Sequence, residues 1–205
     1  MKPPRSPDPA TGLDRPAPSK NPLRRVFSRA PSDTPPLEGL APVVSPGTVV
    51  LVLGSFPSAR SLAQGRYYAH PQNHFWKILQ ALWPSHPLPP GTASTERADW
   101  LLQHGLGLWD VYGRCAREGS LDASIRDAVL NDFAGLDVPR LGAIAHNGAE
   151  SFRHAPKVID ALRESGHGVL PAYKLPSTSP AHAAMSFDRK CEAWHGVFAR
   201  HGLVA

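Results

Sequence analysis

The stretch from Gly54 to Trp76, GSFPSARSLAQGRYYAHPQNHFW, decides how the rest of the chain is interpreted. The apolar run TVVLVL at 48–53 leads into it, and a short β-branched run of this kind predicts a strand buried on both faces. Ligands of open α/β sheets bind where the carboxyl ends of strands open into loops. We therefore expect the turn at 54–57 to form a pocket wall. Whether the aromatic residues at 67–70 contact a ligand or pack stays open.

Strand and helix patterns alternate along the remainder of the chain. The apolar runs predict strands at 48–53, 105–112, 141–148 and 166–174, and the helical periods predict helices at 72–82, 95–104, 121–132 and 187–201. A further helix is expected after 148, interrupted or ended near Pro156. This alternation predicts an α/β domain with a mostly parallel sheet and helices on both of its faces.

Residues 1–36 differ from the rest of the chain in composition. They hold many of the 23 prolines together with scattered basic residues, and such segments cannot bury enough apolar surface to fold. We predict a disordered, basic, Pro-rich tail at 1–36 and a single domain at 37–205. The tail is either a spacer without a role or a weak, non-specific attachment to nucleic acid.

Composition narrows the classes of function. The formal net charge of +5 is compatible with a polyanionic partner. Two cysteines, Cys115 and Cys191, exclude a disulfide framework, and we expect reduced thiols in a cytoplasmic protein, nucleoid-associated if it is bacterial. No apolar run is long enough for a membrane span or a signal segment. The histidines lack the spacing of zinc sites, so no metal and no other cofactor is predicted.

Asn73 is the first candidate for chemistry. A side-chain amide both donates and accepts, so it can hold a water molecule and direct one of its lone pairs at an electrophilic carbon. The competing interpretation is an N-cap for the helix that carries Phe75 and Trp76. The two roles are compatible with each other.

Asp110 ends a predicted buried strand. Its carboxylate could accept a hydrogen bond from a ring N–H, cap the next segment or pair with Arg114, and the residues alone leave these three roles open. In the GSFPS turn, backbone N–H groups can bind a ligand oxygen and Phe56 can stack on a flat ring. The turn lacks the G-x-S-x-G spacing, so neither Ser55 nor Ser58 is expected to be a hydrolase nucleophile.

The loop LPSTSPAHA, at 175–183, is the last candidate segment. The hydroxyls of Ser177, Thr178 and Ser179, with nearby backbone amides, suit the oxygens of phosphate groups. Ala181 and His182 are expected at the tip of the loop. The alternative is an ordinary Ser/Pro turn with a surface histidine.

These segments together resemble the uracil-DNA glycosylase superfamily, and most closely its hypoxanthine-DNA glycosylase branch, the sixth family. The matching motifs are GS-x-P with SL…YYAHPQN-x-FW, then GLWDVY with C-x-R-x-GSLD-x-x-I, then HNGAESF, and finally LPSTSPA. They occur in this order and cover about residues 37–202.

The resemblance implies a three-layer α/β/α sandwich with a short, mainly parallel central sheet. It also implies a monofunctional glycosylase that uses no metal and no Schiff base and leaves an abasic site. Asn73 corresponds to the asparagine held to be catalytically important in that branch. Ser55 stands near the place where many relatives have an Asp or Asn that positions water, and Leu175 where others have a His or Asn that polarises the leaving base. The base-reading asparagine of the family corresponds to Asp110.

From these correspondences we predict that a monomer removes a deaminated base from double-stranded DNA, with single-stranded DNA as a further substrate form, and that the base is hypoxanthine. Asn73 would position the water. The residues expected to bind the base are Gly54, Ser55, Phe56, Pro57, Asp110 and Asn147, and those expected to hold the DNA are Ser177, Thr178, Ser179, Ala181 and His182. The alternatives are excision of uracil, thymine or xanthine, and a DNA-binding module without catalysis.

Overall fold

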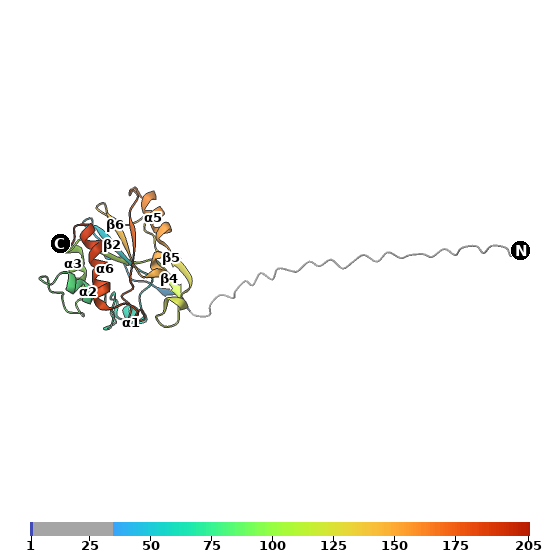
Figure 1. The fold of residues 1–205 in the computed structure, drawn as a ribbon, viewed down its shortest axis with the longest axis horizontal. Coiled ribbons are helices and arrows are strands. Elements are labelled where there is room, and N and C mark those ends of the chain that lie inside the picture. The colour runs from blue at the N-terminus through green and yellow to red at the C-terminus, as the bar shows by residue number, and fades with distance from the viewer. Residues whose placement is uncertain (2–34) are drawn as a thin grey trace. The chain divides into compact units, whose positions relative to one another are not determined.

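The computed structural model describes residue 1 and residues 35–205. The tail predicted at 1–36 therefore lies outside the described residues, apart from positions 1, 35 and 36. The described part is built around a sheet of four parallel strands (Figure 1). In spatial order these are β3 (Leu106–Asp110), β2 (Val50–Gly54), β6 (Ala143–Asn147) and β7 (Ala172–Leu175).

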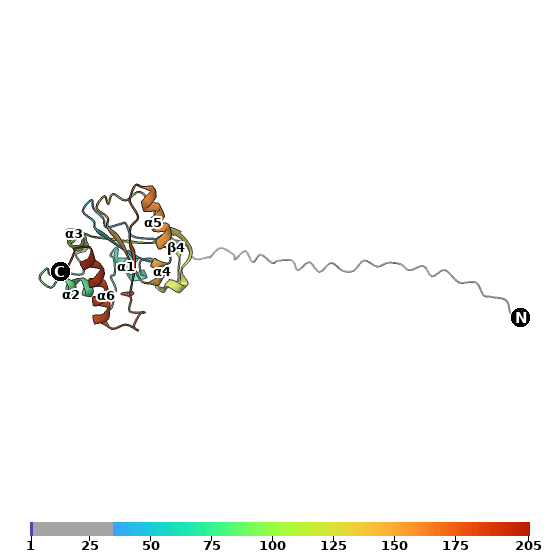
Figure 2. The same ribbon diagram turned by 45° about the horizontal axis from the view of Figure 1, so that its top comes forward.

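Side chains of β2 alternate between two hydrophobic clusters on the two faces of this sheet. Val50 and Val52 pack with α2 (Phe75–Leu82), α3 (Ser94–Gln103) and α6 (Phe187–Arg200). Leu51 and Leu53 pack with α5 (Ala155–Glu164) on the other face. Because both faces are covered, every residue of β2 is buried, as expected for a parallel strand. Figures 1 and 2 show the resulting α/β/α layers, and the predicted fold class is confirmed.

A small antiparallel sheet lies beside the helical layer of α5 and was not predicted. It consists of β1 (Leu37–Glu38), β4 (Tyr112–Ala116) and β5 (Arg126–Leu130), with β4 in the middle. The helix predicted at 121–132 is therefore wrong. A single 3₁₀ turn, η1 (Asp122–Ser124), precedes β5, whose pairing with β4 outweighs the local helical pattern. Ser120, directly before this segment, accepts a hydrogen bond from the backbone N–H of Ala59.

Other boundaries also differ from the sequence expectations. The predicted strand at 105–112 ends at Asp110, and the one at 166–174 is reduced to β7. The short helices α1 (Ala59–Gln64) and α4 (Ala149–Phe152) follow β2 and β6, and α1 was missed although Ser58 caps it. The helical segment after 148 is interrupted near Pro156, as predicted: α4 ends at Phe152 and α5 begins at Ala155. Pro156 lies in the first turn of α5, where its missing N–H has no partner to lose.

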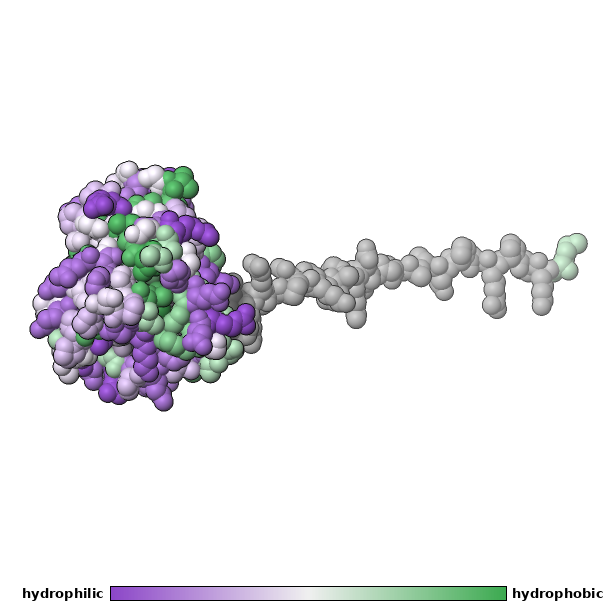
Figure 3. All heavy atoms as spheres, turned by 60° about the vertical axis from the view of Figure 1, so that its left-hand side comes forward, coloured by the Kyte–Doolittle hydropathy of each residue, from purple (hydrophilic) through white to green (hydrophobic). Residues whose placement is uncertain are grey.

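The surface on the α2–α3 side carries a band of hydrophobic residues between hydrophilic ones (Figure 3). Within the described residues, no helix combines the length and the apolar character needed to cross a bilayer. Cys115 is buried and Cys191 half-buried, and both are free thiols.

Candidate active site

The carboxyl ends of the central strands meet at one edge of the sheet. Gly54 pairs in register with Asp110 on one side, and Asn147 pairs with Leu175 at the far end of the sheet. A cavity of about 450 Å³ opens at this edge. Every residue predicted for catalysis, base binding or DNA contact lines it. The structure thus brings the predicted site residues together, and their individual roles remain predictions.

Asp110 forms part of the wall of this cavity and is 4% exposed. A Cβ atom on Gly54 would collide with its Oδ1, which explains the glycine at the strand end. Its Oδ2 has no hydrogen-bond partner within the described part of the chain. Loss of hydration raises the pKa of Asp110 to about 8, against the attraction of the Arg117 guanidinium.

The other two roles left open for Asp110 are not observed. No helix follows it, because β4 begins at Tyr112, so it caps nothing. Arg114 is exposed, and no ion pair joins it to Asp110 in the portion of the chain that the structure describes. The carboxyl group therefore faces the cavity with an unused oxygen.

Asn147 ends the neighbouring strand β6, and its amide is already engaged. Its Nδ2 donates to Tyr68 Oη at 2.9 Å and to Thr178 Oγ1 at 2.8 Å, while its Oδ1 accepts from the backbone N–H of Thr178 at 2.9 Å. Both N–H donors are used within the protein, so only a second lone pair on Oδ1 is left for a ligand. Asn147 and the buried Thr178 hold the 175–183 loop against the sheet.

The hydrogen bond from Asn147 Nδ2 also fixes the ring of Tyr68. The backbone of Tyr68 has a φ of 51°, a left-handed value that is rare for a non-glycine residue. Its ring packs on Phe75 with a centroid distance of 4.2 Å. Tyr67 donates its hydroxyl to the carbonyl of Ala41 at 3.0 Å. The hydroxyl groups of both tyrosines are therefore engaged within the protein, and both residues line the cavity.

Asn73 lies one residue before the N-cap of α2, which is His74. Its Oδ1 accepts the backbone N–H of Phe75 at 2.9 Å, a contact like that of a capping side chain. Its side chain also lines the cavity, and its Nδ2 donates to no protein group among the described residues. The next residue, His74, donates its N–H to the carbonyl of Thr178 at 2.9 Å, which ties the α2 start to the 175–183 loop.

The tip of that loop is anchored from α6. The buried Lys190 donates its Nζ to the carbonyl of His182 at 2.8 Å. Ser177 and Ser179 accept backbone N–H groups of the loop itself, at 3.2 and 3.3 Å. Ala181 and His182 are exposed at the cavity rim. A loop held at both ends presents its small hydroxyls and its tip in a fixed geometry.

Comparison with known proteins shows to which family the chain belongs. A family model described as the uracil DNA glycosylase superfamily matches residues 41–197.

The chain belongs to the uracil DNA glycosylase superfamily.

It is similar to proteins named hypoxanthine DNA glycosylase from Methanosarcina acetivorans and Methanosarcina barkeri, with 35% and 33% identity over 168 residues, or 80% of this chain and 98% of each relative. It also matches the solution NMR structure of a Methanosarcina acetivorans protein described as a candidate uracil DNA glycosylase. That match has a TM-score of 0.65 at 32% identity and covers 82% of this chain and 99% of the other. The chain is therefore a DNA glycosylase, a hydrolase of N-glycosyl bonds, with DNA as its substrate.

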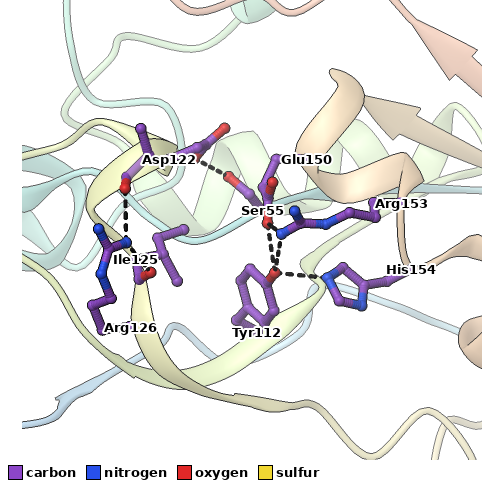
Figure 4. Close-up of polar contacts among 9 residues, drawn as sticks. Ser55, Tyr112, Asp122, Ile125, Arg126, Glu150, Arg153 and His154 are labelled. Atoms are coloured by element: carbon purple, nitrogen blue, oxygen red, sulfur yellow. Dashed lines mark hydrogen bonds and ion pairs between the residues drawn. The ribbon is translucent and has the colours of Figure 1, made fainter. Parts of the chain in front are cut away.

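Two carboxylates in the cavity of the glycosylase were not among the predicted site residues. Asp122, in η1, accepts the hydroxyl of Ser55 at 2.6 Å (Figure 4). Glu150, in α4, accepts the hydroxyl of Tyr112 at 2.6 Å and pairs with Arg153. Both lay inside motifs that carried the resemblance, GSLD and HNGAESF, and those motifs were the available signal.

A larger cavity, of about 760 Å³, lies on the α2–α3 side of Tyr67 and Tyr68, which line both spaces. The cations lining it are Arg60, Arg66, Lys77 and Arg97. Asn73 also lines this larger cavity. Asp110, Asn147 and the GSFPS turn line the smaller cavity, so we consider the smaller cavity the candidate active site.

Proposed function

We propose that this glycosylase removes hypoxanthine from deoxyinosine in double-stranded DNA, acting as a monomer and leaving an abasic site. The relatives named hypoxanthine DNA glycosylase, which the chain matches over nearly their whole length, support this substrate. The single observation that carries the proposal is the unpartnered carboxyl of Asp110 in the cavity wall.

A carboxyl group with a pKa near 8 is mostly protonated at neutral pH, and it then both donates and accepts. Hypoxanthine presents N1–H beside the C6 carbonyl. The carbonyl oxygen of Asp110 would accept N1–H, and its O–H would donate to O6. Two bonds in one plane would select the deaminated edge and withdraw electron density from the base as it departs.

The nucleotide has to leave the duplex before this contact can form, at a cost of a few kcal/mol that is smaller for a mispaired base. Ser177 and Ser179 would hold the flanking phosphates, and Ala181 with His182 would occupy the vacated stack. The ring of Phe56, on the cavity wall, would stack on the purine. Each of these residues reaches the cavity from a segment that hydrogen bonds hold in place.

The chemical step would be a loosening of the bond between C1′ and the base nitrogen, with its electron pair leaving on the base. The sugar then carries cationic character, and a water held by Asn73 attacks C1′. Leu175, which stands where relatives have a polar residue, is buried and does not line the cavity. Stabilisation of the departing base would therefore come from Asp110.

A panel of duplexes tests the proposal. The purified full-length chain is incubated with duplexes that carry inosine, uracil, xanthine or thymine opposite each normal base, and alkali-labile strand breaks are counted. We expect the fastest break at inosine. Breaks at uracil alone would support uracil excision instead, since uracil offers a comparable N–H and carbonyl edge to Asp110. Salt-sensitive binding without any break would indicate a DNA-binding module without catalysis.

A further inference from the structure

The capping contact of Asn73 raises the question of which group accepts the proton of the attacking water. One lone pair of its Oδ1 already accepts the Phe75 N–H, so the group of Asn73 left wholly free is the donor Nδ2. A donor can hold the water oxygen but cannot take up its proton. An acceptor within the same cavity is therefore needed.

Ser55 lines the same cavity and has lone pairs that could serve as such an acceptor. It follows the last residue of β2, lines the cavity, and gives its hydroxyl hydrogen to Asp122 Oδ1 at 2.6 Å, a short, charge-assisted bond (Figure 4). Because that hydrogen is committed, the lone pairs of Ser55 Oγ are the part of the hydroxyl that can meet another donor. Asp122 reaches this position from the η1 turn between β4 and β5.

We propose that Asp122, acting through Ser55, orients the attacking water and takes up its proton. This inference rests on the proposed hydrolysis of a deoxynucleotide in this cavity and adds the residue that completes it. Asp122 is a positioning residue in this scheme, since it acts through Ser55 and does not itself touch the water.

The proton and electron balance of the step is complete with water as the co-reactant. The bond from the water oxygen to C1′ forms while the bond from C1′ to the base nitrogen breaks, and its electron pair stays on the base. One water proton moves to Ser55 Oγ as the Ser55 hydrogen moves to Asp122 Oδ1. The departing base takes a proton from Asp110, and solvent restores both carboxyl groups.

The surroundings of Asp122 raise the pKa of its carboxyl group, which favours uptake of a proton. Lost hydration raises its pKa above the ordinary value, the Ser55 hydrogen bond lowers it, and Glu150 raises it again. Arg117 and Arg153 lower it, from the end of β4 and the end of α4. Asp110, on β3, is the other carboxyl group that interacts with it. The pKa values of both carboxyl groups are raised, so the roles of acid and base are assigned from their contacts: Asp110 has an unpartnered oxygen, and Asp122 accepts the Ser55 hydroxyl.

The first test compares single-turnover release of hypoxanthine by the wild type, Asp122→Asn, Ser55→Ala and the double variant. We expect each single change to lower the rate constant roughly 10–100-fold, and the double variant to be no slower than the worse single one. Additive losses would overturn the proposal, because residues that act as a chain are not additive. Asp137→Asn, an exposed aspartate remote from the cavity, is the matched control.

The second test is the acid side of the pH–rate profile, which a purely structural role would not move. The wild-type rate should fall as pH drops through the pKa of Asp122, and Asp122→Asn should lose this dependence. Glu150→Gln should keep it and move it to lower pH, since a repelling charge is removed. A profile unchanged in Asp122→Asn, or abolished in Glu150→Gln, overturns the proposal. If the wild type releases no base from any duplex, the proposed function fails instead.

Discussion

The ends of β3 and β6 flank the same glycine-terminated strand, and both were expected to read the base. Asp110, at the end of β3, has a buried carboxyl with an unused oxygen. Asn147, at the end of β6, uses both of its N–H donors and its carbonyl oxygen within the protein. Two residues that look equivalent in the sequence therefore differ in what they have left to offer a ligand.

This difference indicates that the two residues have different roles at this edge of the sheet. An unsatisfied buried polar group lowers stability and persists where function requires it. A fully bonded amide adds order to the loop that must meet the DNA. We therefore propose that the β3 end recognises the base and the β6 end positions the loop, and the following changes test this division.

Asp110→Ala should have the largest effect. Removing both the acceptor for N1–H and the donor to O6 should lower single-turnover release from an inosine duplex by about 10³-fold, near the upper range for loss of one such group. Duplex binding, measured by fluorescence anisotropy, should change little because the phosphate contacts remain. A loss below about tenfold would show that Asp110 does not contact the reacting base.

Asn73→Ala should have the second largest effect on the rate, because the Oδ1 of Asn73 is bonded to Phe75 and only its Nδ2 is free for the water. We expect a fall of about 10²-fold in the same single-turnover assay, since one water-positioning group is lost. Removal of the capping bond to Phe75 should also lower the free energy of unfolding by about 1 kcal/mol. If the melting point falls but the rate hardly changes, Asn73 is only a helix cap.

Asn147→Ala should act mainly on structure. It leaves the Thr178 N–H without its acceptor, and such a loss costs about 1–3 kcal/mol of stability. Release should slow by only about tenfold at saturating enzyme, with weaker duplex binding as the 175–183 loop loosens. A loss as large as that of Asp110→Ala, in a protein that is still folded, would remove the distinction between the two strand ends.

Much of this architecture could be predicted from local patterns. The apolar runs marked the parallel strands, and the motifs of the family resemblance, together with the rule that ligands bind at the carboxyl ends of strands, gave site residues that all line one cavity. Whether a polar group is free could not be predicted, because Asn147 and Asp110 are distinguished only by partners on distant segments. Tyr68 and Thr178, which saturate Asn147, are 79 and 31 residues away from it.

The helix prediction for residues 121–132 was wrong for a related reason. Its period favoured a helix, but β5 is exposed at nearly every position and exists because β4 offers it a partner. That pairing also brings Asp122 to Ser55, 67 residues away in the chain. Pairing between strands is not visible in local propensity, so the carboxylate was missed along with the strand.

Asp110→Asn should act on the pH dependence of stability, and its sign is opposite to that of most substitutions. The pKa of Asp110 is raised on folding, so between about pH 4 and 8 the folded state holds a proton that the unfolded state has lost. Wild-type stability should therefore fall with rising pH relative to Asp110→Asn, by up to about 1.4 kcal/mol per pH unit. Urea unfolding at pH 5, 7 and 9 measures this difference. Parallel curves would mean that the carboxyl is ionised at no cost.

The basic side of the pH–rate profile tests the role of the β3 carboxyl most directly. If a neutral Asp110 binds the base edge, single-turnover release of hypoxanthine should be level near neutrality and fall tenfold per unit above about pH 8. The slower Asp110→Asn variant should show no such fall. A wild-type rate that stays level to pH 10, or a fall near pH 8 that persists in Asp110→Asn, would contradict the assignment of base recognition to this carboxyl.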